Sequence, residues 1–195
     1  MKAVLGLGNV SFVLKRYPEA IEHYEKALEI NSSLVKAHYN LGTIFYFQKD
    51  FEKAKKHLLD AVALYPKLLG AYLILAQIFQ LQGKTKDSIE LLSKAIELSP
   101  RNPILFQKLA LLHLHAKQFF PAIEVLLQAV SLSPLDVESN LFLAFTYGQT
   151  KNEVKAFQAI DTCLQACAQS PNPDEALRSL LQSYMYFKTN VVPNG

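Results

Sequence analysis

The sequence repeats itself every 34 residues, and this period restricts the possible folds more than any other feature. A leucine returns at the same phase five times, and a small residue follows it each time. Two further columns of small residues begin at Ala20 and Ala27 and keep the phase as far as Ala156 and Cys163. We therefore predict five similar units, over residues 1–34, 35–68, 69–102, 103–136 and 137–171. The repeated leucines are Leu7, Leu41, Leu75, Leu109 and Leu143.

Each unit is predicted to be a hairpin of two helices, as the second unit shows. Leu41 and Phe45 recur at helical spacing in its first half, and Leu58 belongs to its second half. A turn at residues 48–50 joins the halves. Pro66 ends the second helix because proline lacks the amide hydrogen that a helix needs. The small residues are expected where the two helices cross closely. The chain is therefore predicted to be all-α.

The two ends of the repeat array differ. A helix over residues 174–188, behind Asn172-Pro173, is predicted to cap the last unit, and residues 189–195 form a tail that we expect to be mobile. Residues 1–188 are thus expected to form one domain. The first unit has no such cap beside its apolar Val4 and Leu7. We interpret the chain as a fragment of a longer protein, with self-association through this open end as an alternative.

This pattern resembles the tetratricopeptide repeat (TPR) family over about residues 1–170. The resemblance includes the leucine–glycine pair, the closing proline and an aromatic residue that opens the second helix (Tyr17, Phe51, Phe119). The fifth unit departs from it, because Glu153 replaces the aromatic residue and Pro171 comes three residues late. We therefore expect its second helix to be one turn longer. The resemblance implies an α-solenoid wound as a right-handed superhelix, with the first helices lining its concave side.

The candidate binding residues are the first-helix residues that do not pack within their own hairpin. Most are apolar or aromatic, and contiguous exposed apolar surface usually marks a binding site. We therefore predict a non-enzymatic scaffold or adaptor that holds an apolar peptide or helix of a partner protein. Tighter curvature, the chain's own tail or a second copy would also account for such residues. The candidates are Leu5, Asn9, Phe12, Lys36, Tyr39, Asn40, Thr43, Tyr46, Phe47, Leu73, Gln77, Gln80, Lys108, Leu111, Leu114, Phe142 and Phe145, with Val13 and Leu81 at equivalent positions.

One binding mode of the family is not expected here. Some members grip a chaperone's C-terminal carboxylate with a clamp of basic residues and asparagines. Asn9 and Asn40 are suitably placed, but Leu5, Gly70 and Ile74 stand where the basic residues belong. A carboxylate would lack its charge-assisted hydrogen bonds. The two asparagines remain candidates for bonding a peptide backbone.

Composition narrows the partners and the compartment. Lys and Arg total 20 against 17 Asp and Glu, a surplus too small to indicate nucleic acid. We find no run of 18 apolar residues, so no membrane partner is expected. Asn9 interrupts the apolar start and no cleavage site follows, so the repeat explains these residues better than a signal peptide does. Cys163 and Cys167 lie one helical turn apart, a poor layout for a disulfide, and we expect a cytoplasmic protein.

No catalytic residues, metal site or cofactor are predicted. His113 and His115 point about 200° apart on a helix and cannot share a metal ion. His23 and His57 are interpreted as surface residues, and His38 as a packing residue. Two further hypotheses stay open. One is a repeat module of a larger protein or enzyme. The other is a secretion-type chaperone for hydrophobic segments, although such proteins are usually acidic and this chain has a pI near 8.7.

Overall fold

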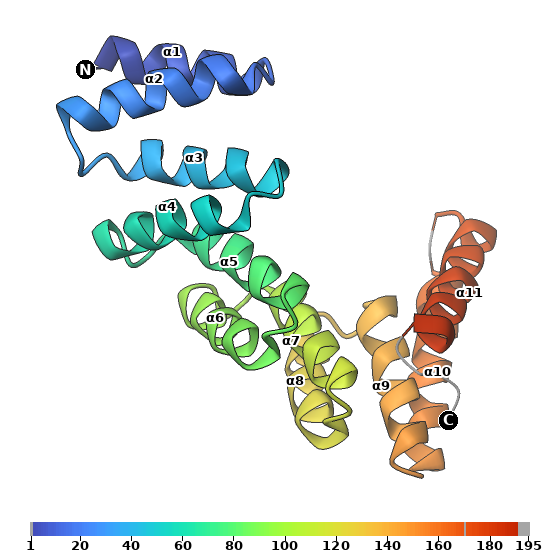
Figure 1. Cartoon of the computed structure of the whole chain (residues 1–195). Helices are drawn as coiled ribbons and strands as arrows, with labels where there is room; N and C mark the ends of the chain where they lie inside the picture. Colours follow the sequence, from blue (N-terminus) through green and yellow to red (C-terminus); the bar gives the residue numbers. More distant parts are fainter. Residues whose placement is uncertain (1, 170, 191–195) are drawn as a thin grey trace. The chain divides into compact units, whose positions relative to one another are not determined.

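The computed structural model describes residues 2–169 and 171–190, which form eleven helices and no strand (Figure 1). The chain divides into two compact units between Leu98 and Ser99. Unit 1 contains α1 (Lys2–Val13), α2 (Tyr17–Ile30), α3 (Val35–Phe47), α4 (Phe51–Leu64), α5 (Leu69–Leu81) and α6 (Thr85–Leu98). Unit 2 contains α7 (Pro103–His115), α8 (Phe119–Leu132), α9 (Val137–Gln149), α10 (Glu153–Ala168) and α11 (Pro173–Asn190).

The helices pair as the 34-residue period predicts. Each odd-numbered helix from α1 to α9 packs most extensively against the even-numbered helix that follows it. Within unit 1, α2 also packs on α3 and α4 on α5, and within unit 2, α8 packs on α9. The first helices of hairpins two to five begin at Val35, Leu69, Pro103 and Val137. The prediction of an α-solenoid of helical hairpins is confirmed.

Small residues let the two helices of a hairpin approach closely. Ala54 on α4 is fully buried against α3. A Cβ atom added to Gly42 would lie 2.6 Å from Leu58 Cγ and 3.2 Å from the backbone oxygen of Ala54. The lack of a side chain at Gly42 therefore allows α3 and α4 to lie this close together.

The turn inside each hairpin uses a left-handed residue at position 15 of the repeat. In the second hairpin, the Asp50 N–H donates to the Phe45 carbonyl at 2.9 Å, which is the long bond of a Schellman motif. This motif needs a positive φ at the residue between the helix end and the donor. The positive-φ residues are Lys15 (58°), Lys49 (61°), Gly83 (72°), Lys117 (56°) and Lys151 (57°).

Helix ends follow the local sequence. Helix α4 ends at Leu64, two residues before Pro66, because the residue before a proline avoids the helical region. The α10 helix has 16 residues where α2, α4, α6 and α8 have 14, so it is longer by about half a turn and not by the full turn predicted.

Helix α11 covers the end of unit 2. It packs against α9 and α10, with Ala176 against the buried Cys163 and Cys167. Both cysteines are free thiols, and burial raises the pKa of Cys163 to about 11, so these are packing residues. Of the predicted tail, residues 189 and 190 belong to α11, and residues 191–195 lie outside the described residues. No helix in the described part of the chain has the length and hydropathy needed to cross a membrane.

Candidate functional site

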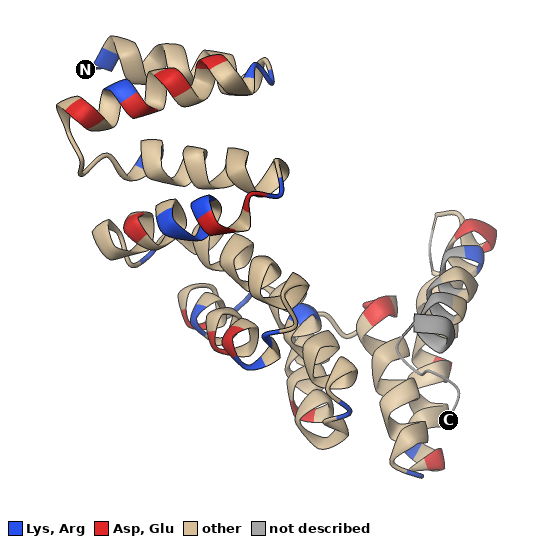
Figure 2. Ribbon diagram, in the orientation of Figure 1, with Lys and Arg blue, Asp and Glu red and all other residues tan. Residues whose placement is uncertain are grey.

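The first helices of unit 1 present a surface almost without charge. Helix α5 contains no charged residue, and α3 contains only Lys36. The acidic and basic residues of unit 1 lie mainly on α2, α4 and α6 and in the turns (Figure 2). A partner that binds α1, α3 and α5 therefore meets mostly apolar and aromatic side chains.

The structure places the predicted residues of unit 1 at different depths. Thr43 is only 9% exposed, and its hydroxyl donates to the Tyr39 carbonyl at 2.8 Å, so it serves its own helix. Phe47, by contrast, is 57% exposed. The other exposed candidates are Lys36, Gln77 and Gln80, and the half-buried ones are Leu5, Asn9, Phe12, Tyr39, Asn40, Tyr46 and Leu73.

Five rings form a continuous row across the first two hairpins, here named the aromatic row: Phe12, Tyr17, Phe47, Tyr46 and Phe51. Tyr17 lies 6.4 Å from Phe12 and stacks on Phe47 at 6.4 Å with an interplanar angle of 24°. Tyr46 lies 5.8 Å from Phe47 and 6.2 Å from Phe51. These separations fall within the range in which aromatic rings attract one another. The row therefore joins three predicted residues to the two aromatics that open α2 and α4.

A second feature, here named the exposed column, runs along the ends of the first helices. Val13, Phe47 and Leu81 occupy the same position in α1, α3 and α5. They are 76%, 57% and 64% exposed. Three large apolar side chains thus face solvent in register, and Phe47 belongs to both the column and the aromatic row.

Asn9 and Asn40 take part in a network that joins three helices. The buried Tyr24 on α2 donates its hydroxyl hydrogen to Asn9 Oδ1 at 2.9 Å. Asn40 Nδ2 donates to Tyr24 Oη at 2.8 Å and to Asn9 Oδ1 at 3.2 Å. Burial raises the pKa of Tyr24, and the bond from Asn40 offsets part of that rise. Both asparagines therefore connect α1, α2 and α3. The other amide atoms of the two side chains, Asn9 Nδ2 and Asn40 Oδ1, take no part in these three bonds.

The predicted residues of unit 2 form no comparable surface. Leu114 and Phe142 are 1% and 5% exposed and belong to one core cluster. Leu111 and Phe145 are half-buried against the same cluster, and Lys108 is exposed. Leu114 and Phe142 are therefore corrected from groove residues to core residues, because packing against α8 and within the fourth and fifth hairpins covers them. We restrict the candidate surface to unit 1.

Sequence reasoning missed one part of this surface. The sequence identifies Tyr17 and Phe51 as residues that open the second helices, but it does not predict their contact with first-helix rings. A usable signal was present, because each follows the exposed end of a first helix by only four residues. A short turn necessarily brings such neighbours together.

Comparison with known protein families fits this architecture. Two sequence models described as tetratricopeptide repeats match residues 2–67 and 39–103, which together span more than half of the chain. The chain belongs to the tetratricopeptide repeat family. This family and its fold support a protein–protein interaction scaffold, because stacked helical repeats create extended surfaces for binding other proteins. No curated protein sequence matches the chain.

Solved structures share the fold at low sequence identity. A crystal structure of MamA protein superposes with a TM-score of 0.75 at 20% identity, covering 85% of this chain and 90% of that one. The structure of YrrB, described as a TPR protein with an unusual peptide-binding site, has a TM-score of 0.72 at 18% identity and covers 90% and 89%. At this identity the likeness establishes the fold alone.

Proposed function

We propose that this chain is a non-enzymatic scaffold that binds an apolar segment of a partner protein along the aromatic row and the exposed column of unit 1. The observation that carries the proposal is the register of Val13, Phe47 and Leu81 on three successive first helices. Their neighbours on α3 and α5 are nearly uncharged. An apolar side chain gains more from such a surface than a charged one does. YrrB, a protein of the same fold, is described as having an unusual peptide-binding site.

The expected affinity is modest. Full burial of a Val, Leu or Phe side chain is worth about 1.5–3 kcal/mol, so covering three that are already partly buried gives about 3–5 kcal/mol. The aromatic row adds to this, while ordering a flexible peptide and losing its free motion oppose binding. We therefore expect dissociation constants of about 0.1 mM or weaker for short peptides.

A displayed peptide library tests this directly. Peptides selected on the purified chain should be enriched in Leu, Ile, Phe and Met, and their affinity is measured by fluorescence anisotropy. The double variant Tyr46→Ser, Phe47→Ser should weaken binding by at least about tenfold, a loss of 1.4 kcal/mol, with unchanged helicity by circular dichroism.

The matched control is Phe120→Ser. Phe120 on α8 is 73% exposed and lies outside the candidate surface, so its loss should leave binding unchanged. Selection of charged peptides, or equal binding by the double variant and the wild type, would contradict the proposal.

A second candidate function is self-assembly, and one observation favours it. Leu7 and Val10 on α1 are 54% and 57% exposed, whereas their equivalents in α3 and α5 are fully buried. A second copy of the chain offers the same apolar face in return. This pairing is compatible with peptide binding, because Leu7 and Val10 belong to neither the aromatic row nor the exposed column.

Two finer hypotheses belong with the main proposal. A secretion-type chaperone would use the same apolar surface, and the pI near 8.7 favours it less than a general scaffold. A module of a larger protein or enzyme would use it for substrate recognition. A cytoplasmic setting is part of our proposal, and the buried free thiols of Cys163 and Cys167 suit a reducing compartment.

A further inference from the structure

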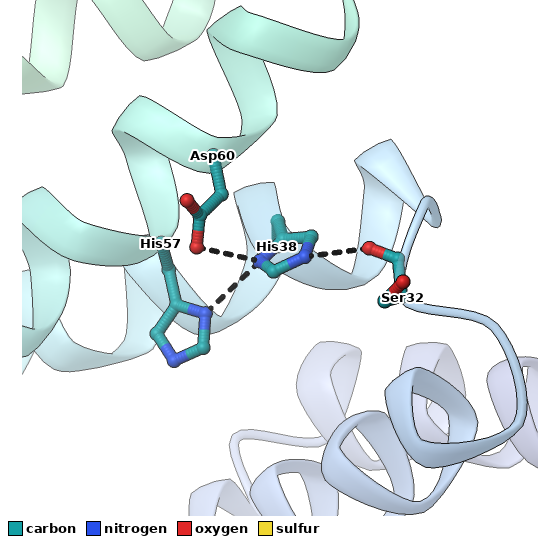
Figure 3. A network of polar contacts seen from close by, with 4 residues as sticks. All are labelled: Ser32, His38, His57 and Asp60. Carbon is teal, nitrogen blue, oxygen red and sulfur yellow. Dashed lines mark hydrogen bonds and ion pairs between the residues drawn. The ribbon is translucent and has the colours of Figure 1, made fainter.

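Three potential metal ligands converge within the second hairpin, on side chains that the proposed peptide surface does not use. His38 comes from α3, and His57 and Asp60 come from α4 (Figure 3). The Nδ1 atoms of the two histidines are 3.1 Å apart, and His38 Nδ1 is 3.6 Å from Asp60 Oδ2. The three ligand atoms all lie within 4.8 Å of one another.

The backbone fixes which nitrogen of His38 faces the cluster. Its Nε2 lies 3.0 Å from the Ser32 carbonyl oxygen, which can only accept a hydrogen bond. Nε2 therefore carries the hydrogen, and in the neutral ring Nδ1 presents its lone pair toward His57 and Asp60. Metal-binding histidines characteristically donate their second nitrogen to a carbonyl or carboxylate in this way.

The spacing suits a small cation. Zinc bound to nitrogen and oxygen at about 2.0–2.1 Å in a tetrahedron holds its ligand atoms about 3.3–3.4 Å apart. The observed separations of 3.1 and 3.6 Å lie on either side of that value. We propose that His38, His57 and Asp60 form a binding site for a divalent transition-metal ion of the zinc type.

The environment supports this assignment. His38 is 11% exposed at its side chain and Asp60 is 47% exposed, so the cluster is anchored on one side and reachable from the other. Phe45 stacks on the His57 ring at 5.7 Å and 15°, which restricts its orientation. Burial, and then His38, lower the pKa of His57, which favours the neutral ring that a metal ligand must have. Three protein ligands leave one tetrahedral position for water or a partner's side chain.

The repeat itself does not require these residues. The first hairpin has His23 where the second has His57, but Val4 and Lys26 stand at the places of His38 and Asp60. The third hairpin has Tyr72, Leu91 and Lys94 at the three places, and the fourth has Phe106, Val125 and Gln128. The fold therefore forms with entirely different side chains at these positions, and the donor set is particular to the second hairpin.

Metal binding requires both imidazole rings to be neutral. In the hydrogen-bonded pair, His57 Nδ1 is the donor to His38 Nδ1. On binding, that hydrogen is replaced by the metal, and His57 carries its single hydrogen on Nε2 instead. Two neutral imidazoles and one carboxylate then surround the ion.

Zinc and cobalt titrations of the tag-free chain test the site, in a Cys163→Ser, Cys167→Ser background that removes the thiols as competing ligands. Competition with a chromophoric chelator should give one Zn²⁺ per chain, and Co²⁺ should develop the visible absorption of a tetrahedral complex. Asp60→Asn and His57→Gln should each weaken binding by at least about tenfold. His23→Gln, at the matching place in the first hairpin, should change nothing.

Circular dichroism of each variant separates lost ligation from lost structure. If the parent chain binds neither ion at micromolar concentration, the cluster is a hydrogen-bond network only and the proposal is wrong. The same conclusion follows if folded Asp60→Asn and His57→Gln bind as tightly as the parent. Neither result bears on the peptide surface, which uses other side chains.

Discussion

At the scale of single residues, the same backbone conformation, a positive φ, recurs in the turn of every hairpin. Position 15 of every repeat has a positive φ, and four of the five residues there are lysines. A residue with a Cβ atom is disfavoured in this region by about 1–2 kcal/mol, so the Schellman hydrogen bonds must offset that strain in each turn. Only Gly83 meets the requirement without strain.

Gly83→Ala should therefore destabilise the chain by about 1 kcal/mol, since left-handed strain exceeds the gain from a stiffer unfolded chain. Chemical denaturation monitored by circular dichroism measures the change. An added Cβ meets nothing within 4 Å at Gly83, so crowding does not complicate the result.

Gly6→Ala is the matched control for that variant. Its Cβ also meets nothing within 4 Å, but the residue lies inside α1, where alanine should stabilise by about 0.5–1 kcal/mol. Equal effects at the two glycines would show that φ at position 15 does not govern stability.

The four lysines show one limit of prediction from sequence. A Gly or Asn in a turn signals a positive φ, and lysine carries no such signal. Gly83 alone marks the conformation, and only the alignment of all five repeats extends it to Lys15, Lys49, Lys117 and Lys151.

At the scale of elements, the crossing of α3 and α4 depends on the absence of one methyl group. Gly42→Ala should destabilise the chain by about 1–3 kcal/mol, because the new Cβ would lie 2.6 Å from Leu58 Cγ in a packed core. Leu58 cannot yield by moving only its tip, and the backbone oxygen of Ala54 is also close. The shift in denaturation midpoint measures this change.

Leu58→Ala combined with Gly42→Ala isolates the contact. Removing the leucine side chain should make the double variant less unstable than the sum of its single changes, since the clash no longer exists. Strict additivity of the two changes would mean that a clash with Leu58 is not what destabilises Gly42→Ala.

Helix boundaries were predictable because proline positions and the repeat phase are local properties of the sequence. The exposure of side chains within the candidate site was not predictable from the sequence, since it depends on which of them the neighbouring helices cover. Leu114 and Phe47 both lie on the predicted inner side, yet one is core and the other is exposed. His38 and His57 are separated by 19 residues, and only the packing of α3 on α4 reveals their contact.

At the scale of the whole molecule, the described residues leave the apolar face of α1 exposed. In α3 and α5 the residues equivalent to Leu7 and Val10 are fully buried, and α2 and α4 pack against those helices. A symmetric pair of chains would cover two leucines and two valines. At about 1 kcal/mol for each half-exposed side chain, the gain is about 4 kcal/mol before the cost of association.

Such a dimer should be weak, with a dissociation constant near or above about 1 mM unless surrounding residues also join the interface. Sedimentation velocity over rising concentration should therefore show an average mass that increases for the wild type. Leu7→Asp with Val10→Asp should hold the chain monomeric, because each dimer would bury four unpaired carboxylates. Val154→Asp with Phe157→Asp, at two exposed sites on α10, is the control and should associate like the wild type. A wild-type chain that stays monomeric up to about 1 mM would show that self-assembly through α1 is too weak to be a function of unit 1.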